Sequence, residues 1–153
     1  MAAGYNHGLA LMRDGAVFAF GSNDHGQTNV PVGFTNFIAI GAGAYHSLGV
    51  LSDGTVVSWG DNYQNHRIVP AGLSNVVAVA GGYYHSLALR SNGTVVAWGL
   101  NGDRQTSVPG GLSNVAAIAA GSFHSLALRK NGTVVGWAAT TMDNARFLVI
   151  SVM

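Results

Sequence analysis

The feature that most constrains this chain is a segment that recurs every 39 residues. Four copies of the segment each carry one histidine at the same place. These histidines are His7, His46, His85 and His124. A fixed period of this length is typical of repeat architectures, in which each unit buries its apolar face against its neighbours. Residues of the types found in catalytic or metal sites are therefore expected to have a structural role in the repeat.

Each copy contains the same elements in the same order. A short apolar run, such as Val76–Val79, is followed by a glycine-rich corner and then by a segment of alternating side chains. An Asp-Gly or Asn-Gly pair comes next, and this pair favours a two-residue hairpin turn because both central residues need positive φ. A β-branched segment such as Thr94–Trp98 closes the hairpin. A polar loop that ends in Val-Pro follows, and the proline fits a short edge strand or its exit.

Side chains alternate in size along the strand that begins at each histidine. Leu87 and Leu89 are expected on one face, and Ser86 and Ala88 on the other. A large face then nests against the small face of the next sheet, so both faces are covered. This agrees with a charged fraction of only 8%, against about 25% in ordinary soluble domains. We predict an all-β fold, a β-propeller of four-stranded blades with about four blades per chain. A solenoid of hairpins is the alternative.

The pattern covers residues 1–138 and fails at both ends. The first copy keeps only Ala2-Ala3-Gly4 of its apolar first strand. Residues 139–153 form a tail without the polar loop, which ends in the β-prone run Phe147–Val152. We expect this tail to act as a closing strand that supplies what the first copy lacks. A truncation of the repeat is the alternative.

The composition argues against several classes of partner. A formal net charge of +1 gives no field to attract nucleic acid or an anionic membrane. No run of apolar residues is long enough for a transmembrane helix, and the absence of cysteine removes disulfides and thiolate metal sites. The segment MAAGYNHG lacks the basic start and apolar run of a signal peptide. The compartment stays open, with secretion expected only if the chain is a piece of a longer protein.

The histidines and serines of the repeat resemble catalytic or metal-binding groups only superficially. Equivalent positions in successive blades spread around a circle, so four imidazoles do not converge on one ion, and we expect a hydrogen-bonding role for them. In a strand, His85 and Ser86 point to opposite faces, so the imidazole cannot activate its neighbour's hydroxyl. We therefore expect no catalytic residue, no metal and no cofactor. His25 and His66 lie in loops and are expected to be solvated.

The His-Ser-Leu, Gly-Thr-Val, Trp-Gly and Gly-Gln-Thr elements recur in order over about residues 2–138. This set resembles the regulator of chromosome condensation repeat family. The short loop that ends in proline is most similar to the bacterial branch, which includes the propeller-type β-lactamase inhibitory protein. Members typically form seven blades. The resemblance therefore implies that one chain does not close a seven-bladed ring, and that a second copy completes a ring of seven or eight blades in a homodimer. A four-bladed monomer is the alternative.

The residue just before each repeat histidine is the strongest functional candidate. In the inhibitory protein of the branch that the chain resembles, the aromatic residue at this position faces the partner. By that resemblance Tyr45, Tyr84 and Phe123 are expected to form an arc on one rim, where aromatic rings give much contact area at little entropic cost. The candidate binding residues are Tyr45, Tyr84, Phe123, Tyr5, Tyr83 and Tyr63. The alternative is that these rings pack the ends of the blades.

Together these observations predict a non-enzymatic binding or scaffold module that presents rim aromatics to another protein, of which an inhibited enzyme is one form. Two alternatives stay open. One is a self-assembling half-propeller with a purely structural role, and the other is a hydrolase with a site in the central channel. The eukaryotic family member exchanges nucleotides and binds chromatin, but the basic tail that this needs is not visible here.

Overall fold

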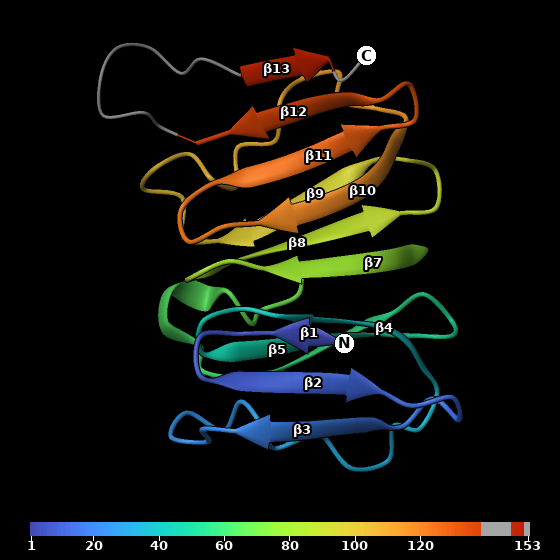
Figure 1. The fold of residues 1–153 in the computed structure, drawn as a ribbon, viewed down its shortest axis with the longest axis vertical. Coiled ribbons are helices and arrows are strands. Elements are labelled where there is room, and N and C mark those ends of the chain that lie inside the picture. Colours follow the sequence, from blue (N-terminus) through green and yellow to red (C-terminus); the bar gives the residue numbers. More distant parts are fainter. Residues whose placement is uncertain (139–147, 152–153) are drawn as a thin grey trace.

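The repeats fold into four antiparallel sheets that stack along the long axis of the molecule (Figure 1). The structure is a computed structural model and describes residues 1–138 and 148–151. Each copy of the repeat supplies one sheet, which we call a blade. Within the described ranges, no helix is long and apolar enough to cross a membrane.

The strands follow the repeat. The first blade contains β1 (Ala2–Ala3), β2 (His7–Leu11) and β3 (Val17–Gly21). The second blade contains β4 (Phe37–Ala42), β5 (His46–Leu51) and β6 (Val56–Gly60). A short 3-10 turn, η1 (Tyr63–Asn65), leads to the third blade. The third blade contains β7 (Val76–Gly81), β8 (His85–Arg90) and β9 (Val95–Gly99). The fourth blade contains β10 (Val115–Ala120), β11 (Ser125–Arg129), β12 (Thr133–Trp137) and β13 (Leu148–Ser151).

The prediction of four strands per blade does not hold for the first three blades, each of which has three strands within the described residues. The polar segment after each outer strand folds into turns instead of a fourth strand. Gly26 and Arg104 have φ angles of 75° and 59°, which a strand cannot accommodate. The amide of Asn29 donates to the carbonyl of Gly26, a bond that closes a turn. Proline in these segments has no N–H to give to a ladder.

The tail was expected to complete the first blade, but in the single chain it does not. Only Leu148–Ser151 of the tail lies within the described residues; Phe147 and Val152 fall outside them. This strand, β13, pairs with β12, where Val149 lies opposite Val135. The figure places β13 and the first blade at opposite ends of the long axis (Figure 1). The free edge of β12 is close along the chain, whereas the first blade lies beyond two intervening blades.

The hydrophobic core forms three layers, each between two neighbouring blades. Leu87 and Leu89 pack against Ala127 of the fourth blade. Ala88 points the other way and packs with Leu48 of the second blade. The predicted alternation of large and small faces is therefore confirmed. Leu87 is fully buried, which is worth about 1.5–3 kcal/mol relative to exposure.

A repeated chain of hydrogen bonds also joins each blade to the next. Nε2 of His46 lies 2.9 Å from Oγ of Ser86, and this hydroxyl donates to the carbonyl of His66 at 2.8 Å. Because the hydroxyl proton is used there, Nε2 is the donor and Nδ1 carries no proton. The same contact joins His7 to Ser47 and His85 to Ser125. The expected hydrogen-bonding role of the repeat histidines is confirmed at these three positions. We call the face with the histidine the outgoing face and the face with the serine the receiving face.

Candidate functional site: an aromatic surface at the blade corners

Five of the six candidate aromatic residues, all except Tyr63, lie in tight corners between the first and second strands of a blade. The amide of Gly43 donates to the carbonyl of His46, and Gly82 makes the same bond to His85. A Cβ at Gly43 would collide with the imidazole of His46, so only glycine lets the ring lie beneath the corner. The two residues between the glycine and the histidine are therefore displayed at the end of the blade.

The six candidate residues form one connected cluster of rings, which we call the aromatic surface. Tyr83 lies at its centre. The ring centroid of Tyr83 is 4.6 Å from that of Tyr84, 5.5 Å from Tyr45 and 5.7 Å from Phe123. Tyr5 joins the cluster through Tyr45, at 6.2 Å. The structure thus brings residues from all four blades together on one surface, although their part in binding stays a prediction.

The aromatic surface has an exposed margin and a more rigid centre. Tyr5 is 69% exposed, Tyr63 is 60% exposed and Phe123 is 48% exposed. Tyr45 and Tyr83 are partly buried, and their hydroxyl oxygens lie 3.0 Å apart. This hydrogen bond, followed by burial, raises the pKa of Tyr45 to about 12. The phenol therefore stays neutral over the physiological range.

The loop after the second blade extends the surface. Tyr63, in η1, packs edge-on against Tyr84 with a centroid distance of 5.2 Å. Burial raises the pKa of Tyr84. Tyr63 was predicted from the sequence as a binding residue, whereas His25 was not. The exposed ring of His25 lies 4.8 Å from that of Tyr45. His25 adds a further planar side chain at the first blade's loop.

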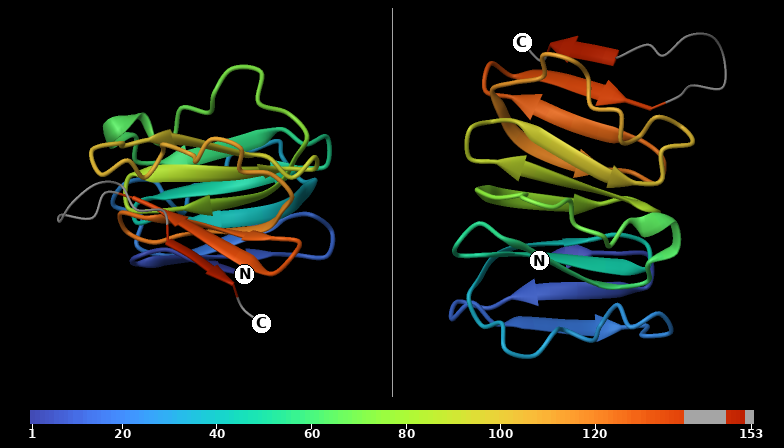
Figure 2. Two further views of the ribbon diagram at one scale, coloured as in Figure 1. Left: turned by 90° about the horizontal axis from the view of Figure 1, so that it is seen from above. Right: turned by 180° about the vertical axis from the view of Figure 1, so that it is seen from behind.

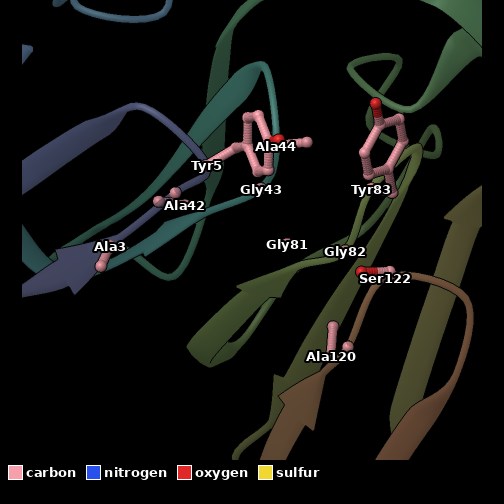
Figure 3. A pocket seen from close by; sticks show the side chains of 12 residues that line it. Ala3, Tyr5, Ala42, Gly43, Ala44, Gly81, Gly82, Tyr83, Ala120 and Ser122 are labelled. Atoms are coloured by element: carbon pink, nitrogen blue, oxygen red, sulfur yellow. The ribbon is translucent and has the colours of Figure 1, made fainter.

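A groove of about 260 Å³ runs through the corners of all four blades, with Tyr5 and Tyr83 on either side of it (Figure 3). Its floor is glycine and alanine because neighbouring corners approach closely. A Cβ at Gly81 would lie 2.5 Å from the backbone nitrogen of Gly43. The groove is smaller than the roughly 300–1,000 Å³ of typical small-molecule pockets. Its size suits one side chain of a partner better than a metabolite.

The expectation that His66 is solvated is wrong, because its side chain is fully buried. His66 stands one period from Gln27 and from Gln105, both of which are also buried. Its ring lies 4.3 Å from that of His46, beneath Tyr84. Burial lowers the pKa of His66. Alignment of the copies, rather than the polarity of the residue, is the sequence signal that could have found this.

The contacts between histidine and serine across the blades resemble a catalytic dyad in distance alone. Ser47 and Ser86 are fully buried, and each hydroxyl donates to a backbone carbonyl. A nucleophile needs a reachable oxygen whose proton goes to the base, and neither condition is met here. No group of three metal-ligating side chains occurs in the described part of the chain.

Four segments of the chain match the Regulator of chromosome condensation (RCC1) repeat. The matched segments are residues 1–27, 37–65, 76–105 and 115–137. They coincide with the four blades and together exceed half of the chain. No curated protein matches the chain.

Several solved structures resemble the fold. Prp20p from Saccharomyces cerevisiae is 26% identical with a TM-score of 0.73, over 90% of this chain and 42% of that protein. The CRINKLY ectodomain of the Arabidopsis thaliana receptor kinase ACR4 is 25% identical with a TM-score of 0.74, over 95% of this chain and 52% of that one. Human WBSCR16 has a TM-score of 0.74 at 22% identity, over 96% and 52% of the two chains. This chain thus spans about half or less of the length of each relative. By its four matching repeats and their propeller-like stacking, it belongs to the regulator of chromosome condensation repeat family.

Proposed function

We propose that this chain is a non-enzymatic, protein-binding propeller module that presents the aromatic surface to a partner protein. The observation that carries the proposal is the connected cluster of six rings drawn from all four blades. Exposed apolar patches of this kind mark interaction sites, and tyrosine is among the residues that dominate binding energy at interfaces. Protein binding in the family supports the reading, since the structure of Prp20p was described together with its binding to Gsp1p and histones.

The mechanism is rigid presentation of preformed contacts. The hydrogen bond between Tyr45 and Tyr83 and the edge-on packing of Tyr83 on Tyr84 hold the central rings before a partner arrives. Ordering flexible side chains on binding costs about 0.5–1.5 kcal/mol each, and this cost is reduced when the rings are already fixed. The groove between Tyr5 and Tyr83 would take one projecting side chain of the partner.

The partner is proposed to be a folded protein, and an enzyme held in an inhibited state is the finer form of the proposal. The resemblance to the bacterial branch of the family supports that form. The rings are neutral, and the groove is lined without any charged side chain. Recognition would therefore depend on shape and apolar contact more than on charge.

The proposal is tested with a variant in which Tyr45, Tyr84 and Phe123 are all changed to alanine. The immobilised chain captures its partner, which is identified by mass spectrometry, purified and titrated against both forms. We expect affinity to fall at least about 100-fold in the variant, because several anchor residues are lost together. Circular dichroism checks that the blades remain folded.

Two controls make the result specific. Tyr45→Phe with Tyr84→Phe keeps the rings and removes only hydroxyls, so it should bind far better than the alanine variant. Val32→Ala is the control for a change elsewhere on the surface. Val32 is 96% exposed and lies shortly before residues 35–36, which pack on the hairpin turn of the first blade at Gly15. Unchanged binding in the triple alanine variant would show that the aromatic surface is not the interface.

A further inference from the structure

All internal junctions between blades use the same two faces. The outgoing face of the second blade places Leu48 and Val50 against Ala88 and Trp98 on the receiving face of the third. The first and third blades dock in the same way on the blades that follow them. Each blade in the middle of the stack therefore has both faces covered.

Two polar groups fasten most receiving faces to the preceding loop. In the second blade, Oγ of Ser47 and Nε1 of Trp59 both donate to the carbonyl of Gln27, at 2.8 Å and 2.9 Å. In the fourth blade, Ser125 and Trp137 make the same pair of bonds to the carbonyl of Gln105. Such a receiving face needs a preceding loop with a free carbonyl.

The receiving face of the first blade lacks both donors. Gly8 stands where the other blades have serine, and Phe20 stands where they have tryptophan; the two are paired in register as Ser47 and Trp59 are. The ring of Phe20 covers Gly8, because a Cβ there would lie 2.5 Å from Cζ of Phe20. This face therefore requires no carbonyl from a preceding loop.

The same face is apolar and open to solvent. Phe18, opposite Ala10 in register, is 63% exposed, and Phe20 is 52% exposed. The two rings are stacked with centroids 6.2 Å apart. End repeats that face water carry a polar outer surface, and this one does not. The face therefore has the character of an interface rather than of a solvent-facing end.

Among the described residues, nothing covers the outgoing face at the opposite end of the stack. His124 is exposed, whereas His46 and His85 are fully buried, and Leu128 is 39% exposed. The stack therefore has an open receiving face on its first blade and an open outgoing face on its fourth.

We propose that the outgoing face of the fourth blade in one copy packs on the receiving face of the first blade in a second copy, head to tail. Phe18 and Phe20 anchor this junction against Leu128. An outgoing face and a receiving face are the two surfaces that meet at every internal junction, which favours a second copy as the occupant. Gly8 offers His124 no hydroxyl there, so apolar contact carries this junction. Two such junctions related by a twofold axis close a ring of two chains, as closed symmetry requires. The proposal uses a surface separate from the groove between Tyr5 and Tyr83.

The test is the mass in solution of the whole chain and of single-face variants, by sedimentation equilibrium at micromolar concentration. The chain of 15.7 kDa should behave as two copies. Phe18→Glu and Leu128→Glu should each give single copies and raise the dissociation constant at least about 30-fold. Both positions are exposed in the isolated chain, so thermal unfolding should remain cooperative. Val32→Glu is the matched control and should leave the mass unchanged.

Mixing the two variants distinguishes a head-to-tail contact from a contact between two identical faces. The Phe18→Glu chain keeps its outgoing face and the Leu128→Glu chain keeps its receiving face, so an equimolar mixture should form a two-chain species with one intact junction. A single-copy mass for the unaltered chain at about 100 μM would overturn the proposal. So would an unchanged mass for Leu128→Glu, which would place first-blade faces against each other. Partner capture by the aromatic surface is read separately, so either idea can fail alone.

Discussion

The loop that follows the second blade differs from the loops after the first and third, although all three occupy equivalent places along one side of the stack (Figure 2). In the first and third loops, the side-chain oxygens of Gln27 and Gln105 accept backbone amides within their own loop. The two glutamine carbonyls each bind a serine and a tryptophan of the next blade. In the second loop, the carbonyl of His66 accepts only from Ser86, and Nε1 of Trp98 is buried without a partner.

The second loop lacks a stabilising hydrogen bond that the other two have, and it carries an exposed tyrosine of the aromatic surface. A buried donor without a partner costs about 1–3 kcal/mol, so the second loop is the weakest of the three attachments. It is also the loop that turns Tyr63 outward against Tyr84. Local rules that are broken at one of several equivalent places often mark a functional position.

The largest expected effect is a loss of stability in acid. Burial lowers the pKa of His85 to about 4 and lowers that of His46 well below its usual 6.5. Because the unfolded chain then binds more protons, stability is complete above about pH 6.5 and is lost as the pH falls from there toward 4. The shift of His85 alone corresponds to about 3 kcal/mol. Chemical denaturation between pH 8 and pH 4 measures it.

The second loop should contribute to this acid sensitivity. Burial and the neighbouring His66 lower the pKa of His46. Burial also lowers the pKa of His66, against a smaller opposing contribution from the carbonyl of Tyr63. Replacing His66 by glutamine removes one buried imidazole and should flatten the pH profile. A profile as steep as that of the unaltered chain would mean that the second junction is no more acid-sensitive than the others.

The next effect compares two buried tryptophans, Trp98 and Trp137. Trp137→Phe loses ring volume and the hydrogen bond to Gln105, whereas Trp98→Phe loses ring volume alone because its indole N–H has no partner. We expect Trp137→Phe to lower the free energy of unfolding by about 1–2 kcal/mol more than Trp98→Phe. Urea unfolding of the two variants gives the difference directly, and equal losses would remove the contrast between the loops.

The smallest effect is a gain. His66→Gln restores the residue found in the other two loops, and its carbonyl should become available to Trp98. We expect the free energy of unfolding to rise by about 1 kcal/mol at pH 7. Thermal unfolding beside the unaltered chain checks it, with Gln105→His as the reverse change. Destabilisation by His66→Gln would indicate that contacts of the imidazole with His46 and Tyr84 outweigh the lost bond.

Periodicity in the sequence was sufficient to predict the blades. The Asn-Gly and Asp-Gly pairs predicted the hairpins, and the alternation around Leu87 predicted which face meets which blade. The resemblance to the family, applied to the position before each histidine, predicted that Tyr45, Tyr84 and Phe123 would share a surface. The turn residues and the alternation of side chains recur in each copy, so the same secondary structure is indicated four times.

What the sequence did not reveal depends on contacts between copies. The bond from His46 to Ser86 joins residues whose positions differ by 40, and no spacing within one copy indicates it. The burial of His66 follows from its place in the loop, while its side chain suggests exposure. The pairing of β13 with β12 depends on which strand edge is free. The absence of hydrogen-bond donors at Gly8 and Phe20 becomes apparent only when the first blade is compared with Ser47 and Trp59 of the second.

The bond from the histidine of one blade to the serine of the next has a consequence for how such chains change over evolution. The second, third and fourth blades carry both halves of the bond, one on each face, whereas the first blade carries the histidine alone. Duplicating or deleting a unit from the middle of the repeat therefore leaves every remaining junction with a matching donor and acceptor. Unit number can change by recombination without new compensating substitutions, and only the two end units need separate adaptation.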